Sequence, residues 1–134
     1  MWTKIIKKGR IGKMHEYHEY YEVEKRLEIS ASHNLNLDYE SKCENLHGHN
    51  WIIKIRLHTN KLNENGMVED FTWIKRIIME KFDHKNLNDF IEQPTAENIA
   101  KYICNMVNEL SNSQKCFWVE VQESEGNKAI YELW

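Results

Sequence analysis

The chain has 134 residues, of which 41% are hydrophobic and 29% are charged, and its formal net charge is −3. This length suits one domain, and the composition is typical of a globular protein. A net negative charge disfavours a surface devoted to nucleic acid, and no run approaches the roughly 18 apolar residues of a membrane span. Neither nucleic acid nor a membrane is therefore an expected partner.

Residues 1–18 are predicted to form an N-terminal extension, followed by one domain over residues 19–134. The extension is basic, and its only adjacent apolar pair among the lysines is Ile5-Ile6. Such a pair is too short for the hydrophobic region of a signal peptide, so we expect a cytoplasmic protein. An odd number of cysteines in such a chain favours reduced thiols over a disulfide framework. These thiols belong to Cys43, Cys104 and Cys116.

Two long strands are predicted at the start of the domain. From Tyr20 to His33 the apolar residues alternate, so one face of the strand is largely apolar and ends in a histidine. After a polar loop, a second strand begins at His47 and ends near Thr59. Its alternation places His49 on the same face as His47.

A short strand is predicted to start at Met67, and the first helix follows it. Asp70 or Thr72 can cap this helix, which is expected to end near Lys81. The segment 82–90 is predicted to be a loop. The buried face of the helix is predicted from apolar residues at helical spacing, namely Ile74, Ile77 and Ile78.

Thr95 fits the N-cap of a second helix. Cys116–Gln122 and Lys128–Trp134 are predicted to pair as a closing hairpin. This order of elements predicts an α+β domain in which two helices cover one face of a four-stranded antiparallel sheet. The apolar face of the second helix is predicted to contain Ile99, Ile103, Met106, Val107 and Leu110.

The spacing of three histidines suggests a metal site. On a strand, His47 and His49 lie on one face, about 6.5–7 Å apart along the chain, and antiparallel pairing can bring His33 beside them. Three neutral imidazoles with an open fourth position suit a catalytic zinc ion. Histidines are also common as satisfied polar residues at sheet margins, so these residues by themselves leave metal binding open.

Several segments, in order from about Tyr20 to the C-terminus, resemble the family of 6-pyruvoyltetrahydropterin synthases and bacterial 6-carboxytetrahydropterin synthases. The resemblance implies a tunnelling fold (T-fold), in which the sheets of several subunits join into a barrel. It also implies a homotrimer or homohexamer with active sites at the subunit interfaces, and a pterin triphosphate as substrate. The matching segments are Ala31–His33, Cys43–Trp51, Gly66–Phe71, Asp83–Asn88, Pro94–Ala100 and Val119–Glu123.

The resemblance also implies roles for residues near the histidines. His33, His47 and His49 would hold Zn²⁺, and Cys43 would be the general base that moves protons at the substrate side chain. A nearby cation can lower the pKa of this thiol from about 8.5 towards neutrality. Cys104 and Cys116 are interpreted as small buried hydrophobic residues.

Further roles follow from the matching loop and strand. Asp83 and His84 would complete a proton relay in which the carboxylate orients the imidazole. Glu123 would anchor the pterin by accepting two parallel hydrogen bonds from the ring. Thr95 and Glu97 would border the pterin pocket, although their roles as helix cap and first-turn acid are equally sufficient.

The resemblance leaves the product open. We prefer conversion of 7,8-dihydroneopterin triphosphate to 6-carboxy-5,6,7,8-tetrahydropterin, with loss of acetaldehyde and triphosphate, for the biosynthesis of queuosine and other deazapurines. The pyruvoyl reaction also suits Cys43. Glu44 resembles a residue of a third branch, which forms 6-hydroxymethyl-7,8-dihydropterin for folate synthesis, or it is a loop carboxylate in water. A non-catalytic zinc- or pterin-binding module is an alternative of another class.

Overall fold

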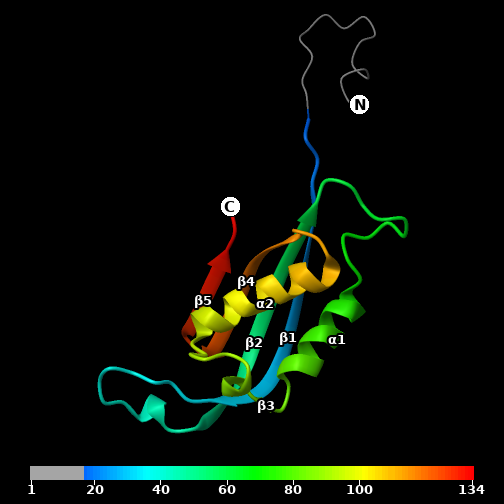
Figure 1. Cartoon of the computed structure of the whole chain (residues 1–134). Coiled ribbons are helices and arrows are strands. Elements are labelled where there is room, and N and C mark those ends of the chain that lie inside the picture. Colours follow the sequence, from blue (N-terminus) through cyan, green and yellow to red (C-terminus); the bar gives the residue numbers. More distant parts are fainter. Residues whose placement is uncertain (1–16) are drawn as a thin grey trace, which may run out of the picture.

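The computed structural model describes residues 17–134. Two long strands, β1 (Tyr21–His33) and β2 (His47–Thr59), pair along their whole length in antiparallel register (Figure 1). Both strands begin and end within one residue of the predicted positions. The extension predicted over residues 1–18 lies almost entirely outside the described residues.

The sheet has five strands rather than the predicted four. On one side of β2, β4 (Cys116–Ser124) and β5 (Asn127–Glu132) continue it in antiparallel register. On the other side, β3 (Lys85–Asn86) pairs with β1 in parallel, so the order is β3-β1-β2-β4-β5 and the sheet is mixed. The prediction of a loop over residues 82–90 missed β3, because a two-residue strand has no alternation to detect and forms only against the edge of β1.

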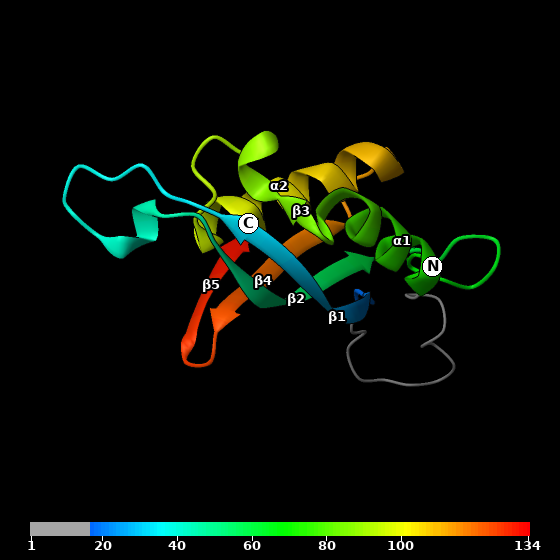
Figure 2. The ribbon, with the colours of Figure 1, turned by 90° about the horizontal axis from the view of Figure 1, so that it is seen from below.

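Both helices lie on one face of this sheet, as Figure 2 shows from below: α1 (Phe71–Phe82) beside β1 and α2 (Ala96–Ser111) beside β4 and β5. Asp70 caps α1 by accepting a hydrogen bond from the backbone of Thr72. Thr95 caps α2 through the backbone N–H of its third residue. The strand predicted at Met67 is wrong, because Met67 closes a turn with Asn63: its N–H donates to the Asn63 side chain, and its carbonyl accepts from the Asn63 backbone N–H.

The core lies between the helices and the sheet. Leu110 was predicted to join it, but this side chain, near the end of α2, is 56% exposed. The remaining apolar positions of α2 are buried or partly buried. Fully buried side chains from the strands and helices include Ile29, Trp51, Ile53, Ile55, Val119, Val121, Ile74, Ile78, Ile99 and Ile103.

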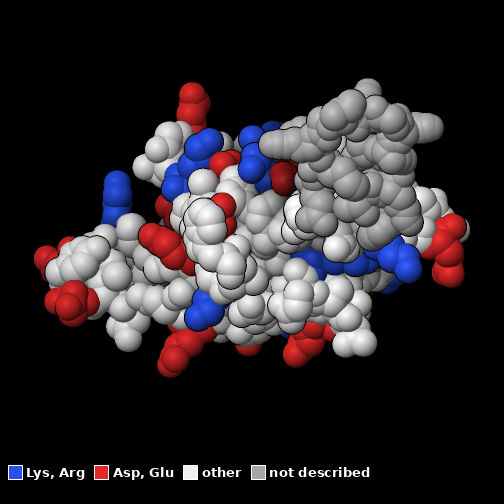
Figure 3. All heavy atoms as spheres, turned by 90° about the horizontal axis from the view of Figure 1, so that it is seen from above, with Lys and Arg blue, Asp and Glu red and all other residues white. Residues whose placement is uncertain are grey.

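The opposite face of the sheet is polar and charged. Arg56 pairs there with Glu24 at 2.9 Å, and Glu120 lies within 4 Å of Lys54 and Lys128. Figure 3 looks from above at another side of the molecule, where basic and acidic side chains are also interspersed rather than gathered by sign. Among residues 17–134, no helix is long and apolar enough to cross a lipid bilayer.

Candidate metal centre and active site

The register of the two central strands brings three histidines together. His33 is paired with His47, and His49 follows two residues later on the same face of β2. This face is the one that the helices cover, and His33 is only 1% exposed. One ring nitrogen from each of the three residues lies within 4.8 Å of the others.

Two backbone carbonyls orient the rings. Nδ1 of His33 lies 2.8 Å from the carbonyl oxygen of Pro94, and Nδ1 of His47 lies 2.6 Å from that of Asn45. A carbonyl oxygen only accepts, so each Nδ1 donates its proton and each neutral ring has its lone pair on Nε2. These two Nε2 atoms are 3.1 Å apart. Two ligands of a tetrahedral zinc ion, each about 2.0–2.1 Å from the metal, would be about 3.3 Å apart.

His49 completes a donor set that fits a metal ion. Its Nε2 is buried and has no hydrogen-bond partner in the described part of the chain, which is unfavourable for a polar atom unless another ligand satisfies it. Burial lowers the pKa of His33 and of His49 and favours the neutral, metal-binding form, although the nearby Glu123 carboxylate opposes this effect. The carboxylate lies 3.8 Å from Nε2 of both rings.

Glu123 connects the histidines to a cavity. It lies near the end of β4 and lines a cavity of about 380 Å³ together with Thr95, Glu97 and Leu35. The structure therefore brings three predicted substrate-binding residues to one place. Oγ1 of Thr95 already accepts a hydrogen bond from the backbone of Asn98 at 3.1 Å, which is its helix-capping role.

Cys43 and Glu44 lie in the loop between β1 and β2, which projects beyond the sheet (Figure 2). Cys43 is half-buried in a single 3₁₀ turn, where its backbone N–H donates to the Ser41 hydroxyl. The Glu44 carboxylate accepts a long hydrogen bond of 3.4 Å from the backbone of Leu37. No hydrogen bond or ion pair within residues 17–134 joins either residue to the histidines.

Asp83 and His84 lie at the edge of β1, where α1 ends. The Asp83 carboxylate accepts a 2.9 Å hydrogen bond from the backbone of Ser30, and its other oxygen is 3.5 Å from Nε2 of His84. His84 has a positive φ of 59° and its side chain is 82% exposed. Among the described residues, the pair makes no hydrogen bond to Cys43 or to the histidines.

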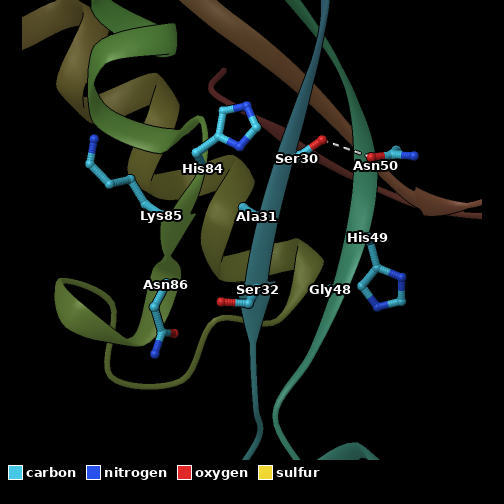
Figure 4. A pocket seen from close by; sticks show the side chains of 9 residues that line it. All are labelled: Ser30, Ala31, Ser32, Gly48, His49, Asn50, His84, Lys85 and Asn86. Carbon is cyan, nitrogen blue, oxygen red and sulfur yellow. Dashed lines mark hydrogen bonds between the residues drawn. The ribbon is translucent and has the colours of Figure 1, made fainter.

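His84 and one of the three histidines, His49, line an open cavity. A cavity of about 510 Å³ is lined by His84, His49 and polar residues of β1 and β3. Figure 4 shows His84 on the β3 side of β1 and His49 on the β2 side, with the Ser30–Asn50 hydrogen bond between them. His84 and His49 therefore border the same cavity, and no hydrogen bond or ion pair within residues 17–134 joins them.

Three groups that support the histidines were not among the predicted site residues. The carbonyls of Pro94 and Asn45 are backbone atoms, and no side-chain pattern identifies them. Trp51 packs its ring edgewise against His33 and His49, with centroids 4.9 and 5.0 Å apart. Its position on the histidine face, two residues after His49, was the signal that could have identified it.

Comparisons with known proteins show the family of this chain. The 6-pyruvoyl tetrahydropterin synthase family model matches residues 22–133. A putative 6-carboxy-5,6,7,8-tetrahydropterin synthase of Archaeoglobus fulgidus is 45% identical over 75 residues, which are 54% of this chain and 63% of that protein. The 6-carboxy-5,6,7,8-tetrahydropterin synthase of Rickettsia bellii is 31% identical over 134 residues, covering 81% of this chain and 96% of that protein.

A solved structure shows the same fold. The 6-pyruvoyl tetrahydropterin synthase of Caenorhabditis elegans superposes with a TM-score of 0.72 at 26% sequence identity, covering 88% of this chain and 99% of that one. The family model spans both helices and all five strands apart from Tyr21, the first residue of β1. The chain therefore belongs to the 6-pyruvoyl tetrahydropterin synthase family of enzymes.

Proposed function

We propose that this enzyme converts 7,8-dihydroneopterin triphosphate to 6-carboxy-5,6,7,8-tetrahydropterin, with loss of acetaldehyde and triphosphate, as a step towards queuosine or other deazapurines. The proposal rests on the convergence of three imidazole nitrogens within 4.8 Å of one another beside the carboxylate of Glu123. The names of its relatives favour the carboxy product over the pyruvoyl product.

His33, His47 and His49 would hold a zinc ion. When bound, Zn²⁺ acts as a Lewis acid that makes protons on the substrate's side chain more acidic. The protein supplies the rest of the arrangement: the Pro94 and Asn45 carbonyls hold two of the rings with Nε2 directed towards the common point. Hydrogen bonds of this kind commonly orient metal-binding imidazoles.

Glu123 would anchor the pterin ring. A carboxylate can accept two parallel hydrogen bonds, here from the 2-amino group and N3–H of the ring, and so set its orientation. The cavity beside Glu123 is bordered by Thr95 and Glu97. Because the carboxylate is 3.8 Å from two of the histidines, a ring bound there would direct its side chain towards the metal centre.

Proton transfer is assigned to Cys43, as general base, and to the Asp83–His84 pair. We propose that the site is completed between copies of the chain in a homotrimer or homohexamer, because the relay pair lies at a strand edge apart from the thiol of its own chain. The pairing of β1 with β3 covers only Ala31 and Ser32. A long unpaired edge is a template for pairing with another chain, as a barrel requires.

Formation of 6-hydroxymethyl-7,8-dihydropterin is the second candidate reaction, because Glu44 lies next to Cys43 at the position that this branch would use. The hydrogen bond from Leu37 offers Glu44 a purely structural role instead. A non-catalytic pterin-binding module is the candidate of another class.

Product analysis by mass spectrometry tests these assignments. The zinc-loaded protein is incubated with 7,8-dihydroneopterin triphosphate beside Cys43→Ala, Glu44→Ala and Glu64→Ala, the last replacing an exposed loop carboxylate as a control. We expect 6-carboxytetrahydropterin and acetaldehyde, and at least about a 100-fold loss of rate in Cys43→Ala, the typical contribution of a general base. A hydroxymethyl product that depends on Glu44 would place the enzyme in the folate branch. If no product forms, the result favours the non-catalytic pterin-binding module.

A further inference from the structure

Two side-chain amides hold the loop between β1 and β2, and each forms two hydrogen bonds with the backbone of a single residue. Oδ1 of Asn88 accepts from the N–H of Asn34 at 2.8 Å, while its Nδ2 donates to the carbonyl of Asn34 at 2.9 Å. Oε1 of Gln93 accepts from the N–H of Asn36 at 2.9 Å, while its Nε2 donates to the carbonyl of Asn36 at 3.0 Å. Neither amide belongs to the proposed catalytic or binding residues.

The residue between the two held positions is bonded to Cys43. The N–H of Leu35 donates to the carbonyl of Cys43 at 2.9 Å. In an extended segment, successive residues direct their hydrogen-bonding groups to opposite sides. One side of the segment 34–36 is therefore bonded to Asn88 and Gln93, and the other side is bonded to the residue that bears the proposed base.

Both amides belong to a segment that is itself well held and that contacts the metal centre. Asn88 lies in the 3₁₀ turn that follows β3, next to the fully buried Leu87. The carbonyl of Gln93 accepts hydrogen bonds from Thr95 and Asn98 at the start of α2. The neighbouring carbonyl of Pro94 orients His33. This segment therefore contacts both a metal ligand and the loop.

We propose that Asn88 and Gln93 are positioning residues, which hold Leu35, and through it Cys43, in a defined place relative to His33. The inference rests on the proposed role of Cys43 as general base. A base must lie within hydrogen-bond reach of the proton that it takes, and a displacement of about 1 Å can lower a rate by about 100-fold. A long loop with a single 3₁₀ turn needs such contacts with other segments to keep one conformation.

The test compares Gln93→Leu and Asn88→Leu with the wild type and with Gln114→Leu, a matched change at an exposed position between α2 and β4. Each protein is loaded with zinc. Measurements are kcat and KM with 7,8-dihydroneopterin triphosphate, the zinc content, and the rate at which iodoacetamide alkylates Cys43. Cys104 and Cys116 are buried and serve as internal references.

We expect a fall in kcat of about 10- to 100-fold in both amide variants, with a smaller change in KM and no loss of zinc. Alkylation of Cys43 should become several-fold faster, because the loop is no longer held. Gln93→Glu keeps the acceptor for Asn36 but loses the donor, so its values should lie between those of the wild type and Gln93→Leu. Gln114→Leu should match the wild type.

Unchanged kcat and unchanged alkylation in both amide variants would overturn the proposal. The proposal would also be overturned if kcat fell only in proportion to a lowered melting temperature, while Cys43 in the folded variant was alkylated at the wild-type rate. If the leucine variants fail to fold, Gln93→Glu and Asn88→Asp provide the same comparison. If the wild type itself makes no product, the proposed function fails, and the alkylation rates still decide whether the amides hold the loop.

Discussion

The imidazole of His33 and the carbonyl of Pro94 are joined by a hydrogen bond of 2.8 Å, which ties the last residue of β1 to the residue before the N-cap of α2. Because the carbonyl accepts, the proton of the neutral ring is on Nδ1, and Nε2 is left for the cluster with His47 and His49. The contact links the helix layer to the end of the sheet at the point where the candidate metal centre lies.

Replacing His49 by alanine should abolish stable zinc binding. His49 is the most direct test because its Nε2 makes no hydrogen bond within the described residues, so the variant removes a candidate ligand without breaking a hydrogen bond of that atom. We expect zinc retained after dialysis, measured by elemental mass spectrometry, to fall at least about tenfold. His18→Ala, at an exposed position, should retain the wild-type content. Equal zinc in His49→Ala would exclude this histidine as a ligand.

Asn108→Leu should destabilise the fold. The buried Asn108 amide accepts from the backbone N–H of Cys116 at 2.8 Å and donates to its carbonyl at 2.9 Å. The variant leaves the buried N–H of Cys116 without this acceptor, and the carbonyl keeps only the side-chain contact from the Cys104 thiol at 3.4 Å. The free energy of unfolding in urea should therefore fall by about 2–4 kcal/mol. Asn105→Leu, exposed on the same helix, should change it by less than about 0.5 kcal/mol. Similar values for the two variants would contradict the role of the buried amide.

The capping role and the binding role of Thr95 can be tested separately. Thr95→Ala removes the acceptor for the Asn98 backbone and should lower the free energy of unfolding by about 1 kcal/mol. Thr95→Asp keeps a good cap, but it adds a negative charge to the cavity that Glu123 lines. We therefore expect near wild-type stability and a raised KM in Thr95→Asp. If its KM stays at the wild-type value, Thr95 has no part in binding.

Asp70 should contribute to stability in a pH-dependent way. Hydrogen bonds from the Thr72 hydroxyl and backbone hold the pKa of the Asp70 carboxyl below its usual value. A group with a lowered folded-state pKa stabilises the fold above its unfolded pKa of about 3.9, and this contribution is lost as the pH falls through the lower folded value. The difference in urea midpoint between wild type and Asp70→Ala should therefore be largest near neutral pH and smaller near pH 3. If the difference in urea midpoint is the same at both pH values, the stabilising effect of Asp70 does not come from its charge.

Local sequence patterns predicted most of the secondary structure. The alternation that ends in His33 and the one that starts at His47 identified both long strands, because side chains on a strand have a period of two. Asp70 and Thr95 identified the helix starts, because a side-chain oxygen there satisfies a free backbone N–H. The errors fall at Met67, where the backbone closes a local turn with Asn63, and in segment 82–90, where β3 forms only against the distant edge of β1.

The alternation of side chains along a strand already predicts that His47 and His49 share one face. The position of His33 opposite His47, the contact of its ring with Pro94 and the 3.8 Å distance to Glu123 all depend on how the strands and helices pack together. The same holds for the placement of Asp83 against the edge of β1. These contacts join residues far apart in the chain, and they form only when the register of the sheet and the packing of the helices bring the residues together.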